Sequence, residues 1–488
     1  MPPMERITKS PWPSPVSSGS PSDLSETQET FMFIDYQDES SQAHAVAKRK
    51  QAFLKRQHYR SKKEKRLQKL KASIPSLPTY PSIWSWDRAM QAGGLDLFSS
   101  FADSMTESMC YYFHYYRTQC SRSIYPFGAT GMGAWWLQQA IGQPALLHII
   151  LSTSAIHRAG RGSLPQSSPT VQKAQRDSLK FRAITLKQLQ IMVQSPTEAL
   201  LESTLFIITH LICVEAADAN LEAADCHLSA LIRMVHLMGG LDALNPMTVS
   251  MIYCADFMSA ALKISTPVFP MSVRWKSEVL GSSDIFPSMN DAADLTMVGG
   301  RFFDSPWSEA LHPTLRTIVR LFRRITHCLS TMGATEIPVL NEWLAYAIHQ
   351  LLSIAHDCMA SDLHECLRLS VLVYSMVEIK TFGGLPYMSS VVMALRSRLR
   401  TGLPQIQRIA PDLSFWMLFV GGIASKGRAS RAWFVAHLAE VAEQLSLMEW
   451  DTVLPVLEGF LFIYQPACPQ PEALWNEVKR QQALEHDA

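Results

Sequence analysis

The stretch Asn220–Pro270, NLEAADCHLSALIRMVHLMGGLDALNPMTVSMIYCADFMSAALKISTPVFP, decides the fold class. Asn220 is a suitable N-cap, and the pair Gly239-Gly240 supplies a stop because glycine reaches the left-handed conformation that closes a helix. A second helix follows and ends before Pro267. Each helix carries apolar residues at steps of three and four, as expected on one face of an α-helix: Ala224, Leu228, Leu231, Val235 and Met238 in the first, Met251, Ala255, Met258 and Leu262 in the second.

The same period continues outward from this stretch. It runs from about Trp84 to nearly the end of the chain, and alternating strand patterns are scarce. Two further helices are predicted near the C-terminus from Phe434, Leu438, Val441 and Leu445, and from Val453, Val456, Leu457, Phe460 and Leu461. The sequence thus predicts an all-α domain of a dozen or more helices over residues 84–480, too continuous to divide further.

The N-terminal part of the chain has a different composition. Residues 1–30 hold six Pro and seven Ser, so we expect disorder there because little apolar surface is available to offset the ordering entropy. Residues 31–73 contain an apolar patch, Phe31–Ile34, and then a basic run without Gly or Pro, which favours a helical arm. Residues 74–83 are Pro-rich and are expected to form a linker.

Charge is distributed unevenly along the chain. Residues 48–71 contain twelve Lys or Arg and one Glu, a local charge of +11 within a total of +1, which leaves −10 for the remainder. A basic arm on an acidic body suggests a polyanionic partner for the arm. The candidate residues for DNA binding or nuclear import are Lys48, Arg49, Lys50, Lys55, Arg56, Arg60, Lys62, Lys63, Lys65 and Arg66.

The nine cysteines show no CxxC spacing, and most lie in apolar helical stretches, which is typical of a reducing compartment. No zinc-ligand spacing is found, and we expect no metal and no cofactor. No apolar run is long enough for a signal peptide or a membrane span, so we expect a soluble intracellular protein without a membrane partner.

Four blocks together resemble the large helical domain of fungus-specific transcription factors. The first is AADCHLSALIRMVHLMGGLDAL (Ala223–Leu244), and the second is ADFMSAALKISTPVFP from Ala255. ECLRLSVLVYSMVE (Glu365–Glu378) and FWMLFVGGIASKGRASRAWFVAHL (Phe415–Leu438) follow in the family's order. The matching positions are His227, Gly239, Gly240, Asp256, Ala260, Pro267, Pro270, Trp416, Gly421, Gly422 and Trp433.

The resemblance implies a nuclear regulator of transcription, often of nutrient use or of secondary-metabolite gene clusters. Many members of this family begin with a six-cysteine, two-zinc DNA-binding cluster, whereas the first cysteine here is Cys110. Without that cluster, DNA contact depends on the basic arm alone and is expected mostly at phosphates, with low sequence selectivity.

Three interpretations of the basic arm stay open. Lys62–Arg66 is sufficient for a nuclear-import signal, which implies an import receptor as partner. Direct DNA contact is the second, since cations that reach the backbone release condensed counterions. A merely solvated charge run is the third. No sustained heptad is present, so a leucine zipper and a dimer seam are not predicted.

The sequence does not predict an enzyme. His356-Asp357-Cys358 and His364-Glu365-Cys366 are adjacent residues that diverge by about 100° on a helix, so neither trio converges on one point. Gly128, Gly131 and Gly133 lack the Lys-Ser or Lys-Thr of a phosphate loop, and with Gly421-Gly422 they are interpreted as helix stops or close-packing positions.

Two function classes remain. One is a DNA-contacting regulator; the alternative is a co-regulator that acts on other transcription regulators through the helical domain. An effector pocket between helices is possible in either case, with unknown ligand and lining. His227 is expected to be a buried, hydrogen-bonded histidine. The aromatic clusters Tyr111–Tyr116 and Trp135-Trp136 are expected in the core.

Overall fold

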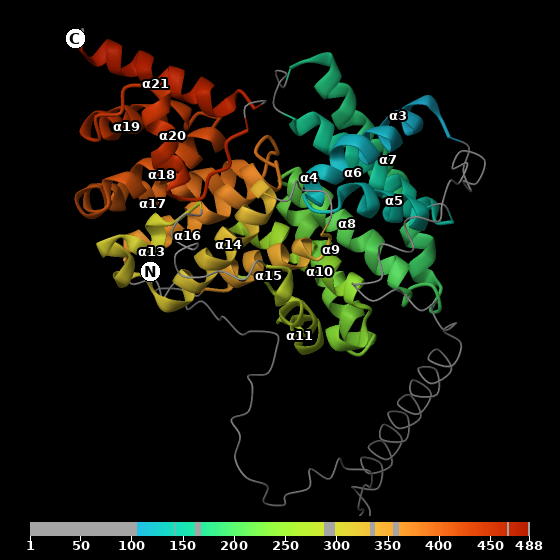
Figure 1. The fold of residues 1–488 in the computed structure, drawn as a ribbon. Coiled ribbons are helices and arrows are strands. Elements are labelled where there is room, and N and C mark those ends of the chain that lie inside the picture. Colours follow the sequence, from blue (N-terminus) through green and yellow to red (C-terminus); the bar gives the residue numbers. More distant parts are fainter. Residues whose placement is uncertain are drawn as a thin grey trace, which may run out of the picture. The chain divides into compact units, whose positions relative to one another are not determined.

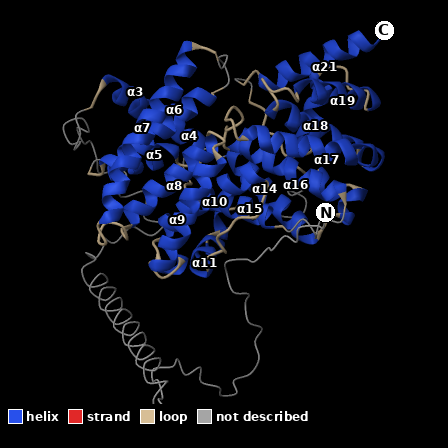
Figure 2. Ribbon diagram, turned by 180° about the vertical axis from the view of Figure 1, so that it is seen from behind, coloured by secondary structure: helices blue, strands red, loops and turns tan. Residues whose placement is uncertain are grey.

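The computed structural model describes residues 105–140, 142–161, 167–286, 298–331, 337–354, 361–465 and 468–486. The chain divides into two units, Met1–Pro75 and Ser76–Ala488, and every described residue belongs to the second. The described part of this unit is helical and contains no strand, which confirms the all-α prediction (Figure 2). The expected disorder, arm and linker of residues 1–83 lie outside the described residues.

The first half of the domain builds around α6, α8 and α10. α6 packs along α7, α8 packs on both α9 and α10, and α3 and α5 cover α6. The elements of this half are α3 (Glu107–Tyr115), η1 (Tyr116–Cys120), α4 (Ser121–Ile124), α5 (Ala129–Ala140), α6 (Pro144–Gly160), α7 (Pro169–Gln194), α8 (Glu202–Ala217), α9 (Leu221–Leu237), η2 (Leu241–Ala243), α10 (Pro246–Lys263), α11 (Val273–Gly281) and η3 (Ser283–Ile285).

The second half is a succession of neighbouring helices. α16 packs on α17, α17 on α18, α18 on α19, and α19 on α21. Its elements are α13 (Arg301–Asp304), η4 (Pro306–Ala310), α14 (Pro313–Thr331), α15 (Leu340–Ser353), α16 (Asp362–Tyr374), η6 (Ser375–Ile379), α17 (Met388–Ile409), α18 (Pro411–Ala424), α19 (Arg431–Gln444), α20 (Trp450–Glu458) and α21 (Gln470–His486).

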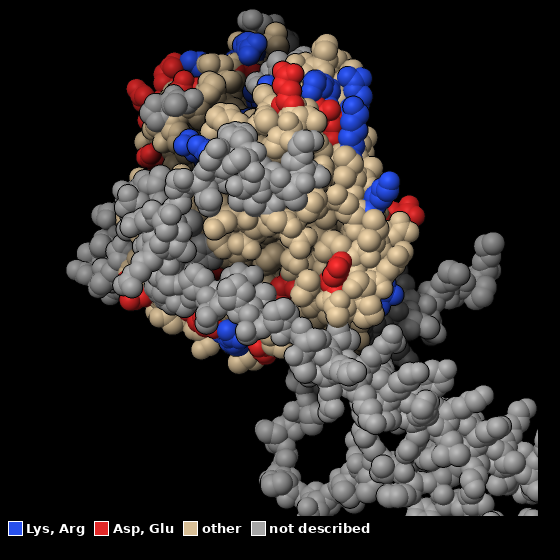
Figure 3. Space-filling view, turned by 90° about the vertical axis from the view of Figure 1, so that its right-hand side faces the viewer, with Lys and Arg blue, Asp and Glu red and all other residues tan. Residues whose placement is uncertain are grey.

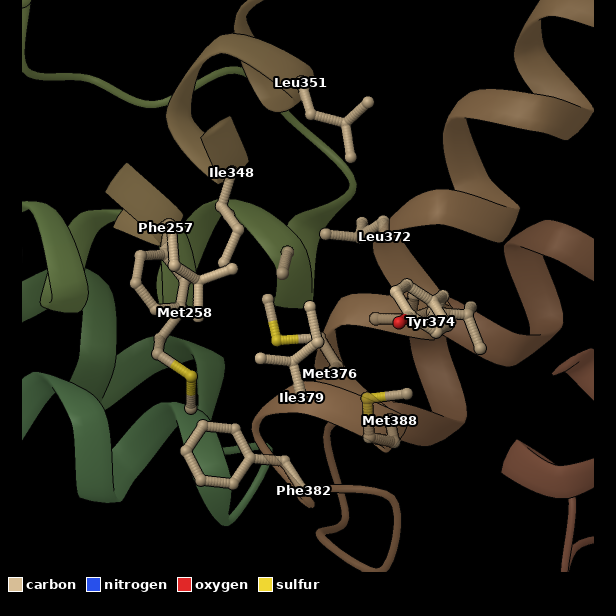
Figure 4. Close-up of a cluster of buried hydrophobic side chains, with 14 of the residues drawn as sticks. Phe257, Met258, Ile348, Leu351, Leu372, Tyr374, Met376, Ile379, Phe382 and Met388 are labelled. Atoms are coloured by element: carbon tan, nitrogen blue, oxygen red, sulfur yellow. The ribbon is translucent and has the colours of Figure 1, made fainter. Parts of the chain in front are cut away.

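α10 and α15 join the two halves. Figure 1 shows them between the α3–α9 side and the α16–α21 side, and α10 contacts both α15 and α17. In Figure 4, Phe257 and Met258 of α10 face Ile348 of α15 together with Met376, Ile379 and Phe382 from the region after α16. These side chains are almost completely buried, so one hydrophobic core runs through both halves.

α9 and α10 form as the sequence predicts. The Asn220 side chain accepts a hydrogen bond from the Ala223 amide, which caps the start of α9. Gly239 and Gly240 follow the helix with φ of 100° and 90°, a region that disfavours side chains with a Cβ atom. Four of the five predicted α9 positions are buried, Met238 is partly buried, and Met251, Ala255, Met258 and Leu262 are buried. The helix–glycine turn–helix prediction is confirmed.

Near the C-terminus the prediction is only partly right. α19 contains Phe434, Leu438 and Val441 on its buried face, as expected. α20 ends at Glu458, so Phe460 and Leu461 lie beyond it, although both are fully buried. The apolar pattern therefore predicted the burial of these residues correctly but placed the end of the helix too late. Buried residues in a loop and in a helix are both apolar, so the pattern cannot distinguish them.

The aromatic clusters behave mostly as core. Tyr112 and Tyr116 are buried, whereas Tyr111 is half exposed, and Trp136 is buried beside a partly buried Trp135. Trp136 donates its indole hydrogen to the Tyr125 hydroxyl at 2.6 Å. Tyr112 donates its hydroxyl hydrogen to Asp177 at 3.1 Å, so the polar edges of Trp136 and Tyr112 find partners within the core, whereas the buried hydroxyl of Tyr116 has none among the described residues.

The outer side of α7 carries both charged and apolar side chains, and its Lys173, Arg176, Lys180 and Lys187 are exposed. Figure 3 shows one side of the molecule, where charged side chains gather toward the upper part of the view. α7 exposes Leu179 and Ile191 by more than half. None of the described helices is both long and apolar enough to cross a membrane.

Candidate functional site

The basic arm, which carried the sequence-based site prediction, lies outside the described residues. All ten candidate cations between Lys48 and Arg66 therefore keep the standing of predictions. The candidate sites that the structure does describe belong to the helical domain, at the junction of its two halves.

Asp256 organises this junction. Its side chain is 1% exposed, and its two oxygens accept hydrogen bonds from the amides of Val268 and Phe269 at 3.0 and 2.8 Å. Burial outweighs these bonds and raises the pKa of Asp256 to about 6. The carboxyl fastens the segment that follows α10 back onto the helix, close to where Ile264 turns the chain in the left-handed conformation.

A second group of hydrogen bonds extends from Tyr253. Its hydroxyl accepts from the Ser272 amide at 2.6 Å and donates to the Pro270 carbonyl at 3.1 Å. The Ser272 hydroxyl donates to Asp242 at 2.5 Å, and His349 of α15 contacts the Phe269 carbonyl at 3.0 Å. These hydrogen bonds fix the segment after α10 against α10 and α15. The family-like residues between positions 239 and 270 therefore have a structural role and do not line an open surface.

His227 does not follow its prediction. It is partly buried, and within the described part of the chain its ring has no hydrogen-bond partner. Burial and the nearby charge of Arg182 lower its pKa. The prediction of a buried, bonded histidine is wrong because His227 lies beside the buried stripe of α9 instead of within it.

A small apolar cavity lies between α6, α8, α10 and the segment after η6. Its volume is about 70 Å³, and the chemically notable groups that line it are Cys120, Cys213, Cys254, His157, His210 and Lys380. Ligand sites for drug-sized molecules measure roughly 300–1,000 Å³, so this cavity is too small for such a ligand.

Burial shifts the pKa values of several titratable groups that line this cavity. Burial raises the pKa of the Cys254 thiol to about 11 and lowers the pKa values of His157 and His210 to about 4. Burial also lowers the pKa of Lys380, whose amine donates to the Ile124 carbonyl at 2.6 Å. The protonated thiol and neutral imidazoles are poorly suited to nucleophilic or acid–base work at neutral pH.

A second, more polar cavity adjoins the first. It has a volume of about 300 Å³ and lies between the end of α6, η6, the end of α18 and the segment between α20 and α21. His157, Arg161, Glu378, Thr381 and Lys426 are among its lining residues. Burial alone raises the pKa of Glu378 to about 7. Arg161 contacts Gln119, and the Thr381 hydroxyl donates to Ser123 at 2.6 Å.

The enzyme-like trio His364-Glu365-Cys366 does not assemble into a site. In α16, Glu365 pairs with Arg368 at 2.7 Å while His364 bonds to the Ala310 carbonyl, and Cys366 is buried. His356-Asp357-Cys358 lies outside the described residues. Among the described residues, no three His, Cys, Asp or Glu side chains are grouped to hold a metal ion.

The glycine predictions are correct in part. Gly421 and Gly422 lie inside α18, not at its end, so the helix-stop interpretation is wrong for them. A Cβ atom at Gly421 would meet Phe434 at 2.3 Å, which shows that close packing is their role. Gly128 precedes α5 with φ of 65°, and Gly133 packs within that helix against Ser121.

Sequence reasoning missed two charged residues that line these cavities, the buried Lys380 and the partly buried Glu378. Both follow an apolar helical run, and α16 continues into the π-helix η6 without a breaking residue. The only available signal is the pair of charges in YSMVEIK, which is equally compatible with a solvated helix end.

Comparison with known proteins supports the family identified from the four blocks. No curated protein and no solved structure gives a significant match. The model of one family, described as the fungal specific transcription factor domain, matches residues 111–458, which include all four blocks. That match covers well over half of the chain, and the chain therefore belongs to the family of proteins with a fungal specific transcription factor domain.

Proposed function

We propose that this transcription regulator acts in the nucleus and contacts DNA through the basic arm at residues 48–71. Its family membership carries the regulatory role. The arm supports the DNA contact, since +11 charges within 24 residues favour a polyanion. Regulation of one pathway, such as a secondary-metabolite gene cluster, is the proposed scope.

The arm also supports nuclear import. Lys62, Lys63, Lys65 and Arg66 are clustered as an import receptor requires, and this role is compatible with DNA contact. A test of DNA binding in cells must therefore supply import by another route, because loss of import alone would abolish chromatin occupancy.

The discriminating experiment compares chromatin occupancy of the full chain with that of a chain lacking residues 48–71, both fused to an unrelated import signal. A control variant removes two exposed cations of the helical domain instead, with Arg233→Gln and Arg400→Gln. We expect occupancy to fall on deletion of the arm and to remain in the control.

Binding to a duplex in solution gives a second test. The logarithm of affinity should fall with the logarithm of salt concentration by about 0.9 per phosphate contacted. An affinity that is independent of salt, or unchanged without the arm, contradicts direct DNA contact.

The co-regulator is the second candidate function, and it is supported by residues 1–109, which contain no cysteine to bind zinc in a DNA-binding cluster. Chromatin occupancy that persists after deletion of the arm, but is lost when another regulator is removed, would select the co-regulator. Flanking biosynthetic genes in the genome would test the pathway-specific scope at least cost.

A further inference from the structure

A third cavity lies at the surface between α14 and α15, next to the end of α11. Its volume is about 520 Å³, within the range of small-molecule sites. Ile318 contributes to an aliphatic base, and Trp343 and Tyr346 of α15 contribute aromatic rings. Figure 1 shows α14 and α15 next to each other on the side where α11 lies. An apolar base with aromatic rings suits a flat organic molecule.

Two arginines of α14 line the same cavity. Arg320 and Arg324 are one helical turn apart, so they project to the same side of α14. The Arg320 guanidinium lies 4.9 Å from the centre of the Phe303 ring, and that of Arg324 lies 5.6 Å from the Phe286 ring. Within the described part of the domain, neither has a carboxylate or a hydrogen-bond acceptor as partner. The rings hold the cations in place and leave their forked donors available.

Two further polar side chains line this cavity. Tyr346 and Gln350 are partly buried, and among the described residues neither side chain has a hydrogen-bond partner. Burial raises the pKa of Tyr346, so its hydroxyl remains a donor at neutral pH. Both side chains can therefore offer a hydrogen bond to a molecule in the cavity.

The positive charge of α14 favours a negatively charged ligand. α14 contains four arginines, at positions 316, 320, 323 and 324, and no Asp or Glu from Pro313 to Thr331. Arginine donors in such a field attract carboxylates, sulfonates and phosphates and repel cations.

We propose that the α14–α15 cavity binds a small organic anion with a flat apolar body. Arg320 and Arg324 hold its acidic group, Trp343 and Tyr346 contact its ring, and Gln350 satisfies a further polar atom. This inference goes beyond the proposed DNA contact and does not depend on it, since it concerns α14 and α15 alone.

The test uses the full chain and the fluorescent probe anilinonaphthalene sulfonate, an aromatic anion. The neutral analogue phenylnaphthylamine has a similar body without the acid. Arg320→Gln/Arg324→Gln is the test variant, and Arg233→Gln/Arg400→Gln, on exposed cations of α9 and α17, removes the same charge elsewhere. We expect the test variant to weaken binding of the anionic probe by at least about tenfold, because a charge-assisted bond is worth more than a neutral one. The control variant and the neutral analogue should show little change.

Three outcomes overturn the proposal. Equal binding of the anionic probe to the wild type and the test variant means that the arginines do not hold the acid. If inorganic phosphate competes with the probe as strongly as an aromatic carboxylate does, the cavity binds anions without recognising an aromatic body. Displacement of the probe by duplex DNA at far lower concentration than by any small acid means a polyanion surface. Arg320→Gln alone, at an exposed position, provides a variant that keeps its fold.

Discussion

Two groups of arginines in the helical domain differ in what they contact. Arg182 of α7 is buried and pairs with Glu215 at 2.7 Å and with Asp218 at 3.1 Å, both in the region of α8. Arg320 and Arg324 of α14 lie on aromatic rings without an acidic partner in the described structure. The first group fixes the packing of two helices, whereas the second is available to something outside the chain. Pairing, and not charge, separates a structural arginine from a binding arginine.

The largest expected change in unfolding free energy comes from Arg182→Met. Glu215 would stay buried without its cation, and removal of one partner from a buried pair costs about 3–5 kcal/mol of unfolding free energy. Urea unfolding of the variant measures this loss. Lys173→Met breaks a pair whose lysine is 61% exposed, so we expect at most about 1 kcal/mol there. Equal effects of the two variants would contradict the distinction between buried and exposed pairs.

The second effect concerns the pH dependence of stability and depends on Glu378, which is partly buried and has no ion-pair partner among the described residues. Burial raises its pKa in the folded protein from 4.5 to about 7, so its contribution to stability is present below about pH 4.5 and is lost as pH rises through about 7. The wild type should lose about 2–3 kcal/mol over this range relative to Glu378→Gln. Thermal unfolding at several pH values measures the difference. Glu443→Gln, at an exposed position, should leave the pH profile unchanged, and a profile shared by all three chains would refute the assignment.

The third effect tests packing in place of charge. Gly421→Ala places a Cβ atom 2.3 Å from the ring of Phe434, which is fully buried, so one of the two must shift. Overpacking of this kind costs about 1–3 kcal/mol. Gly281→Ala is the control, because its Cβ atom has nothing within 4 Å. Chemical denaturation should place the control at or above wild-type stability, and a Gly421→Ala variant as stable as the control would show that α18 and α19 can separate.

The smallest effect is expected for the α14 arginines. Arg320→Gln/Arg324→Gln removes two cations without breaking an ion pair, so the unfolding free energy should change by no more than about 0.5 kcal/mol. The same unfolding measurement applies. A loss above about 1.5 kcal/mol would show that these arginines are structural after all, and the contrast with Arg182 would fail.

The sequence predicted most of the fold but little of the candidate sites. α9 and α10 were predictable because their caps, glycine stop and apolar stripe agree locally. The cavities were not, since Lys380 reaches the Ile124 carbonyl across 256 positions of sequence. Gly421 and Gly422 were misassigned for the same reason, because their role depends on Phe434 and Leu474 in other helices.

By itself, the sequence determined that the domain is helical, where its best-capped helices begin and end, and to which family it belongs. These properties follow from local period, turn residues and motif order. Only the tertiary structure decided which charges are paired: Arg182 meets Glu215 across 33 positions, while Arg320 and Arg324 lie on aromatic rings and have no carboxylate partner among the described residues. The physical reason is that pairing depends on distance in space, and an arginine in a helical pattern carries the same charge whether or not the fold brings a carboxylate to it.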